Sequence, residues 1–153
     1  MSILKVNTIQ KKDGSAFPLG KIGQIVQTTS NTNIATTSST FVTTNFSLSI
    51  TPTSTSSKVL LTLNSVGQVS SSDMNLDIYR STSSSFVSGG KTRGLVGLEA
   101  ANSMMPMPII FLDEPSTVAE ITYTIYVRNN SGGTSSFLRA DMLSAFQAME
   151  VLA

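Results

Sequence analysis

The segment Glu120–Arg128 alternates between apolar and polar side chains without a slip. On an extended chain, one face carries Ile121, Tyr123, Ile125 and Val127. The opposite face is polar, and Tyr126 is its only large ring. A period of two residues is the pattern of a β-strand that is buried on one side. The segment therefore predicts a strand of a packed sheet, with Tyr126 pointing outward.

The same period returns elsewhere in the chain, and convincing helical patterns are absent. Further strands are expected at 24–28, 41–50, 58–69, 74–80, 95–98, 109–112, 137–138 and 146–152. A β-bulge is expected near Asn45, because Phe41 and Phe46 have opposite parity. The apolar run 109–112 predicts a buried strand, and 58–69 predicts a strand covered on both faces. The sequence Asn129–Gly133 (N-N-S-G-G) predicts a hairpin.

Turn-forming sequences separate these runs at intervals of about 8 to 14 residues, as in antiparallel sandwiches. The predicted fold class is all-β, an antiparallel β-sandwich of jelly-roll type. Residues 1–20 contain a short strand candidate and a Lys-Lys-Asp-Gly turn. One isolated strand cannot bury its apolar side without a partner. We expect an N-terminal anchoring arm at 1–20, with Leu4, Val6, Ile9 and Phe17 as contacts, and a head domain at 21–153.

Composition argues against most catalytic chemistry. The 153 residues include no histidine, cysteine or tryptophan, and 10 Lys and Arg balance 9 Asp and Glu. Triads built on histidine or cysteine are therefore impossible, and zinc sites are not expected. No basic face for nucleic acid and no apolar run for a membrane helix is present. Weak charge protects a β protein poorly against association, which suggests work inside an assembly.

Paired carboxylates are the remaining catalytic option. The candidates are Asp73 with Asp77, Asp113 with Glu114, and Asp141 with Glu150. On one strand, Asp73 and Asp77 would lie about 13 Å apart, too far for either glycosidase geometry. Asp113 and Glu114 are most simply explained by a turn. We therefore expect no enzyme activity, no cofactor and no metal site.

Two polar loops are the candidates for contacts with other molecules. They are residues 81–90 and 129–135, and their contact residues together with the exposed ring are expected to be Ser84, Phe86, Gly89, Asn130 and Tyr126. Core or interface packing is the expected role of Tyr79 and Tyr123. Methionine is soft and adaptable, and proline is excluded from central strands. The segment 104–108 (M-M-P-M-P) therefore has two interpretations, core packing or a subunit interface made by Met104, Met105 and Met107.

Three segments resemble a family of tailed-phage fibre and virion structural proteins, especially those of marine and cyanobacterial phages. They are L-K-V-N-T-I-Q at 4–10, S-L-S-I-T-P-T-S-T-S-S-K-V-L-L at 47–61, and F-L-D-E-P-S-T-V-A-E-I-T-Y at 111–123, with A-M-E-V at 148–151 in agreement. The resemblance implies synthesis in the host cytoplasm, location in the virion, a C-terminal β-sandwich head and a homotrimer. The chain lacks the long repetitive shaft of longer relatives, which favours a short fibre or knob.

Three functions follow as hypotheses. The first is a structural virion component, a short fibre or knob or a capsid decoration protein, whose partners are copies of itself and capsid, tail or baseplate proteins. The second is a receptor-binding module that contacts a host-surface glycan. The third, a polysaccharide-degrading enzyme, has the least support. Neither nucleic acid nor a membrane is an expected partner.

Overall fold

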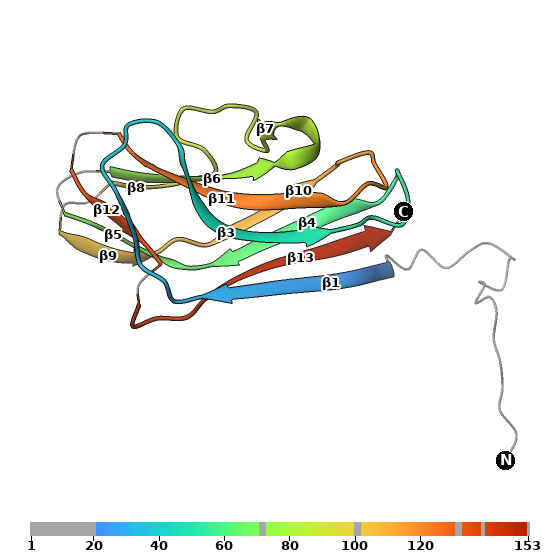
Figure 1. The fold of residues 1–153 in the computed structure, drawn as a ribbon, viewed down its shortest axis with the longest axis horizontal. Helices are drawn as coiled ribbons and strands as arrows, with labels where there is room; N and C mark the ends of the chain where they lie inside the picture. The colour runs from blue at the N-terminus through green and yellow to red at the C-terminus, as the bar shows by residue number, and fades with distance from the viewer. Residues whose placement is uncertain (1–20, 71–72, 100–101, 131–132, 139, 153) are drawn as a thin grey trace, which may run out of the picture.

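The computed structural model describes residues 21–70, 73–99, 102–130, 133–138 and 140–152. In this part of the chain the fold is almost entirely β-strand, and its one helical element is the short 3-10 turn η1 (Ser81–Ser83). Two sheets lie face to face as layers (Figure 1). The predicted arm contacts Leu4, Val6, Ile9 and Phe17 lie outside the described residues.

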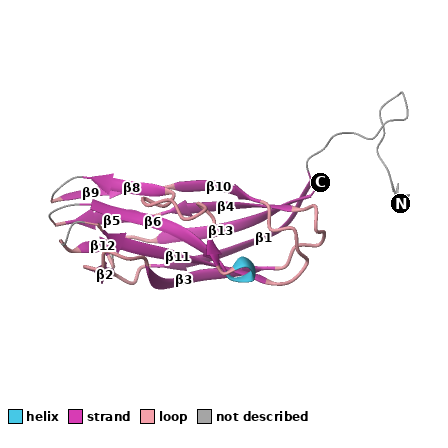
Figure 2. Ribbon diagram, turned by 90° about the horizontal axis from the view of Figure 1, so that it is seen from above, coloured by secondary structure: helices cyan, strands magenta, loops and turns pink. Residues whose placement is uncertain are grey.

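The first layer contains four antiparallel strands in the order β1-β13-β4-β10. Their bounds are β1 Lys21–Ser30, β13 Ser144–Leu152, β4 Lys58–Asn64 and β10 Ile109–Asp113. Further along the same layer, four more strands in the order β2-β12-β5-β9 extend β1, β13, β4 and β10 respectively (Figure 2). Those bounds are β2 Ile34–Thr36, β12 Ser135–Phe137, β5 Val66–Val69 and β9 Ser103–Pro106. β9 and β10 are separated near Met107, which lies between two prolines that have no N–H to donate to a neighbouring strand. The Met107 N–H itself donates to Ser65 O (2.9 Å).

The second layer has the order β3-β11-β6-β7, and β8 also pairs with β6. Its bounds are β3 Val42–Ile50, β11 Ile121–Asn129, β6 Asp73–Arg80, β7 Ser85–Phe86 and β8 Val96–Glu99. β7 and β8 are two parts of one edge strand, separated by residues 87–95. Gly94 returns the chain toward β6 with φ +64°, where an added Cβ would lie 2.3 Å from Leu76 O. An interrupted edge discourages pairing with other strands.

The strand order identifies the sandwich as a jelly roll. Counting interrupted strands once, the first layer has the order 1-8-3-6 and the second 2-7-4-5. Every connection crosses between the layers except the one from β6 to its neighbours β7 and β8. Eight strands connected as two Greek keys define a jelly roll. The predicted fold class is therefore confirmed.

The core lies between the layers and is formed by the alternating apolar positions. Along β11, Ile121, Tyr123, Ile125 and Val127 have no exposed surface. β3, β6, β4 and β13 contribute Phe46, Leu48, Met74, Leu76, Ile78, Val59, Leu61, Phe146 and Ala148. The predicted bulge is present: Asn45 has φ 57°, and the β3–β11 register shifts beside it.

Three sequence predictions about strands were wrong. The N-N-S-G-G segment is not a hairpin, because β11 pairs with β3 and β6 whereas β12 pairs with β2 and β5. β10 is an edge strand whose Ile110 is 79% exposed, rather than a buried strand. The run 58–69 divides into β4 and β5, and its outward residue Leu60 is only partly covered. An apolar sequence does not by itself show on which faces of a strand another layer of the protein packs.

Candidate interaction surfaces

Four aromatic rings pack on the outer face of the second layer. Tyr126 lies 5.3 Å from both Tyr79 and Phe86, and Phe41 lies 5.1 Å from Phe86, measured between ring centroids. All four side chains are partly buried. Tyr126 therefore points outward from the core as predicted, but its ring contacts its neighbours. Tyr79 also lies in this outer cluster, whereas Tyr123 is completely buried in the core.

The segment 87–95 covers the adjoining part of this outer face. Val87 N–H and Leu95 N–H donate to the carbonyls of Ile78 and Leu76, both at 2.9 Å. Ser88 donates to the Asp77 carboxylate. Burial raises the pKa of Asp77, and the hydrogen bonds from Ser88 and from the Ile78 N–H oppose that rise. The chain thus covers the β6 part of this face with its own residues, and Asp77 is completely buried there.

The predicted contact residues do not form one site. Phe86 and Tyr126 belong to the ring cluster, whereas Ser84 and Gly89 lie in the connections around β7. Asn130 lies at the opposite end of β11, where its N–H donates to Asp73 at 2.8 Å. Ser81 lies near the start of β11, because Thr122 N–H donates to Ser81 Oγ at 2.9 Å. The two predicted loops therefore cannot contact one small ligand together.

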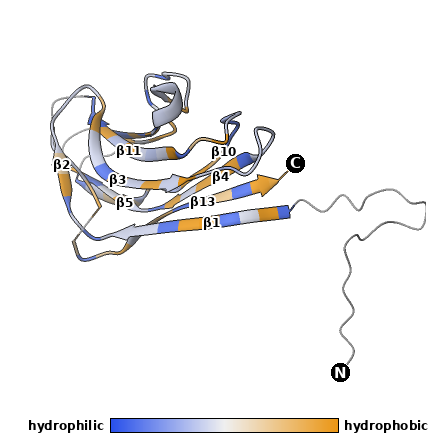
Figure 3. Cartoon of the chain, turned by 45° about the vertical axis from the view of Figure 1, so that its right-hand side comes forward, coloured by the Kyte–Doolittle hydropathy of each residue, from blue (hydrophilic) through white to orange (hydrophobic). Residues whose placement is uncertain are grey.

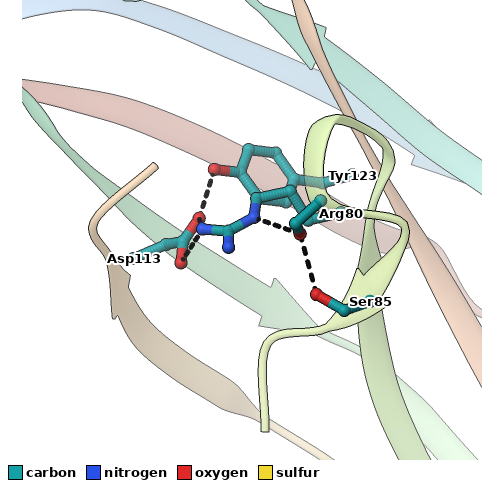
Figure 4. Close-up of polar contacts among 5 residues, drawn as sticks. Arg80, Ser85, Asp113 and Tyr123 are labelled. Carbon is teal, nitrogen blue, oxygen red and sulfur yellow. Dashed lines mark hydrogen bonds and ion pairs between the residues drawn. The ribbon is translucent and has the colours of Figure 1, made fainter. Parts of the chain in front are cut away.

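A buried ion pair connects the two layers beside Tyr123. Arg80 on β6 donates to both Asp113 oxygens at 2.9 Å, and Tyr123 donates to Asp113 Oδ2 at 2.6 Å (Figure 4). Arg80 Nε also donates to Ser83, which contacts Ser85. Burial, and then the neighbouring Asp113 carboxylate, raise the pKa of Tyr123. Asp113 is therefore an inter-sheet contact, which corrects its assignment as a simple turn residue.

We predict that Asp113→Ala lowers the free energy of unfolding by about 2 kcal/mol or more, because it leaves a largely buried guanidinium and a phenol without their acceptor. Urea unfolding at pH 7 measures the change. Glu114→Ala is the matched control, since Glu114 is exposed and its ion pair with Lys58 is a surface contact worth about 0 to 1 kcal/mol. Equal losses in the two variants would contradict the role of Asp113.

A buried carboxylate lies where β1 enters the sandwich. Glu150 on β13 accepts hydrogen bonds from Thr53 N–H (2.6 Å), Thr53 Oγ1 (2.7 Å) and Gln24 Nε2 (3.4 Å). A Cβ at Gly23 would lie 2.7 Å from Glu150 Oε2, so a side chain at this position would have to displace the Glu150 carboxylate. Burial by itself raises the pKa of Glu150, but these hydrogen bonds outweigh it and lower the pKa to about 2. Glu150 thus holds the first residues of β1 and the loop 51–57.

Acid should weaken the fold through Glu150. Its pKa is 4.5 in the unfolded chain and about 2 in the folded chain, so the folded state binds fewer protons between these values. The stabilisation is complete above about pH 4.5 and is lost as the pH falls toward 2. Glu150→Gln should be less stable than the parent at pH 7 and equally stable near pH 2. Urea midpoints across this range test the prediction, with exposed Glu120→Gln as control. A constant difference between the parent and Glu150→Gln would refute it.

The outer face of the first layer is apolar and uncovered among the described residues. Ile22, Ile25, Ile110 and Leu112 are 61%, 59%, 79% and 46% exposed. Strand pairing aligns Ile25 with Met149, Met149 with Leu60, and Leu60 with Leu112. Hydrophobic positions on β1 and β13 are visible along this layer in Figure 3. This surface was not predicted from the sequence, because only the strand register shows that these residues are neighbours.

The methionine segment divides between edge and core. Met104 and Met105 lie on the edge strand β9 and are 52% and 46% exposed. Met107 is 1% exposed and packs near Gly67, where an added Cβ would lie 2.4 Å from its sulfur. Of the two interpretations of this segment, core packing therefore holds for Met107, and its assignment to a subunit interface is wrong. Met104 and Met105 remain open to a partner.

The acidic residues proposed as catalytic pairs have separate surroundings. Asp77 binds Ser88, Asp113 binds Arg80, Glu114 pairs with Lys58, and Glu150 binds Thr53. Within the described residues, no group of three or more acidic side chains is placed to hold a metal ion. In the same part of the chain, no helix is long and apolar enough to span a bilayer.

No protein-family model and no curated protein matches the chain. Solved structures that match include chains from particles of infectious bursal disease virus. One is from the T13 viral particle (10% identity, TM-score 0.45, 98% of this chain and 40% of that chain). Others are from T=1 particles (12%, 0.45, 98% and 41%) and from the VP2 subviral particle (12%, 0.42, 98% and 42%). The chain spans about two fifths of the length of those viral chains.

Proposed function

We propose that the chain is a non-enzymatic structural protein of a phage virion. It forms a short fibre or knob in which residues 1–20 anchor to the particle and the jelly-roll heads project as a homotrimer. The observation that carries this proposal is the contrast between the two outer faces. Segment 87–95 covers the β6 part of the second layer's outer face, whereas the first layer's outer face has an apolar row that no described residue covers. Large exposed apolar patches mark sites of protein association.

The position of the chain ends fits an anchored head. β1 begins and β13 ends at the same end of the sandwich, since Lys21 pairs with Leu152 (Figure 1). A segment that precedes Lys21 therefore joins the head at this end and leaves the opposite end free to project. Gln24 on β1 donates to Glu150 on β13 at this junction (3.4 Å), so a load on the arm would be transmitted to the central strand β13.

Deletion of residues 1–20 tests the proposal. The truncated chain should stay folded, because the jelly-roll strands begin at Lys21, but it should no longer join the particle. Circular dichroism measures folding, and tagged chains in purified phage particles measure incorporation. The matched control is the full chain with Lys11→Ala and Lys12→Ala, which keeps the apolar arm residues. Incorporation of the truncated chain at the parent level would contradict the anchoring role, as would its failure to fold.

A second candidate, contact with a host-surface glycan, is favoured by one shallow hollow. Asn33, Gln68, Ser136, Ala140 and Asp141 line it, on the β2-β12-β5 part of the first layer at the end away from Lys21. Amide, hydroxyl and carboxylate groups of this kind hydrogen-bond sugar hydroxyls. Retention of saccharides on an array by the parent, and its loss in Gln68→Ala, would favour this function.

A capsid decoration role would instead give a copy number that matches the capsid lattice.

A further inference from the structure

The apolar outer face of the first layer indicates how copies of the chain associate. We propose that the surface formed by the outward residues of β1, β13, β4 and β10 packs against the same surface of a second copy. This inference rests on the proposed function and names the interface that the assembly would use. We call this surface the open face. Its apolar residues are Ile22, Ile25, Leu60, Ile110, Leu112, Met149 and Val151.

The register makes these side chains one continuous surface. One row crosses all four strands through Ile25, Met149, Leu60 and Leu112. Residues directly opposite on antiparallel strands have Cβ atoms about 5 Å apart, so neighbours in a row touch. Ile110 lies in the next row, and Ile22 with Val151 lies in the row on the other side. The open face thus has one apolar row across all four strands, with Ile22 and Val151 beside it on one side and Ile110 at the β10 end of the neighbouring row on the other.

The polar groups on the open face already have partners within the chain. The adjacent row contains Gln27, Gln147 and Thr62. Gln147 donates to Gln27, and Thr62 donates to Gln147 at 3.2 Å. Buried polar groups cost little when they are hydrogen-bonded and cost more when they are not. A partner that covers this row would therefore bury side chains that already have hydrogen bonds within the chain.

Charge favours a second copy as the occupant. Among the outward positions of these four strands, Lys58 is the single charged residue, and Glu114 pairs with it at 2.6 Å. The formal net charge of the whole chain is +1. Two identical copies can therefore approach through this face with little like-charge repulsion, whereas a strongly charged partner would find no complementary groups.

The area of the open face suits an interface between copies. The strands β1, β13, β4 and β10 have 10, 9, 7 and 5 residues, which at about 3.3 Å per residue and a strand spacing of about 4.8 Å cover about 490 Å². Two such surfaces together bury about 1,000 Å², which is close to the roughly 1,000 Å² expected of a specific interface. In the proposed trimer, three heads that turn this face toward a common axis would each divide it between two neighbours, so that one part of the face packs against a different part of the same face on the next copy.

Charge substitution on the open face tests the inference. The full chain carries Ile110→Lys and Leu112→Lys, and its mass is measured by light scattering and sedimentation. The parent should be an oligomer, and the variant should fall to the subunit mass of 16.2 kDa. The matched control carries Val118→Lys and Leu143→Lys, two apolar residues that are 52% and 71% exposed elsewhere. The control should keep the parent mass.

Circular dichroism should be unchanged in both variants, because all four residues are exposed in the single chain. If the Ile110 and Leu112 variant is unfolded, Ile25→Glu on the far side of the face provides the second test and should also dissociate the oligomer. An oligomer that persists in the folded face variants would overturn the inference. So would a parent that is monomeric at all concentrations.

The alternative occupant, residues 1–20 of the same chain, is an outcome of the same experiment. If the arm covered the open face, the full chain would be monomeric and deletion of 1–20 would cause association. That result would overturn the inference. The proposed function fails by a different measurement, namely incorporation of the truncated chain into particles. Persistent oligomers in the face variants, together with arm-dependent incorporation, would refute this interface and leave the proposed function standing.

Discussion

Each sheet of this protein has two faces, and the burial of apolar side chains on both faces is the constraint on which the structure depends. The inner faces satisfy it together, because the alternating residues of β11, β6 and β3 pack against those of β4 and β13. With no cysteine in the chain, this packing is not reinforced by disulfides. The Arg80–Asp113–Tyr123 contact and the Glu150 contacts hold the layers and strand ends that packing alone leaves free.

The outer faces meet the constraint in different ways. On the second layer, an interruption in the edge strand provides residues 87–95, which lie over Asp77, while Phe86 completes a cluster of aromatic rings beside them. On the first layer, β13 and β4 are central strands, but their outward residues have no cover from the described residues. Contiguous apolar patches are uncommon on soluble proteins that work alone and mark sites of association. In the proposed assembly, other copies of the chain supply the missing cover.

Sequence periodicity predicted the parts of the fold that depend on local alternation. The strand at Ile121–Asn129, the bulge at Asn45 and the jelly-roll class all followed from the spacing of apolar residues and turns. Contacts between distant strands were not predictable in this way. Asp113 and Arg80 are 33 residues apart, and Glu150 and Thr53 are 97 apart, so only the topology brings them together. The hairpin prediction failed for the same reason, since N-N-S-G-G suits a crossover between layers as well as a hairpin.

Side-chain oxidation footprinting of the full chain measures directly whether the open face is accessible in solution. At assembly concentrations, Ile25, Ile110 and Leu112 should be protected relative to Val118 and Leu143, although Ile110 is the most exposed large apolar residue among those described for the single chain. Dilution should bring their reactivity up to the level of Val118 and Leu143. Equal reactivity of all five residues at every concentration would contradict the account.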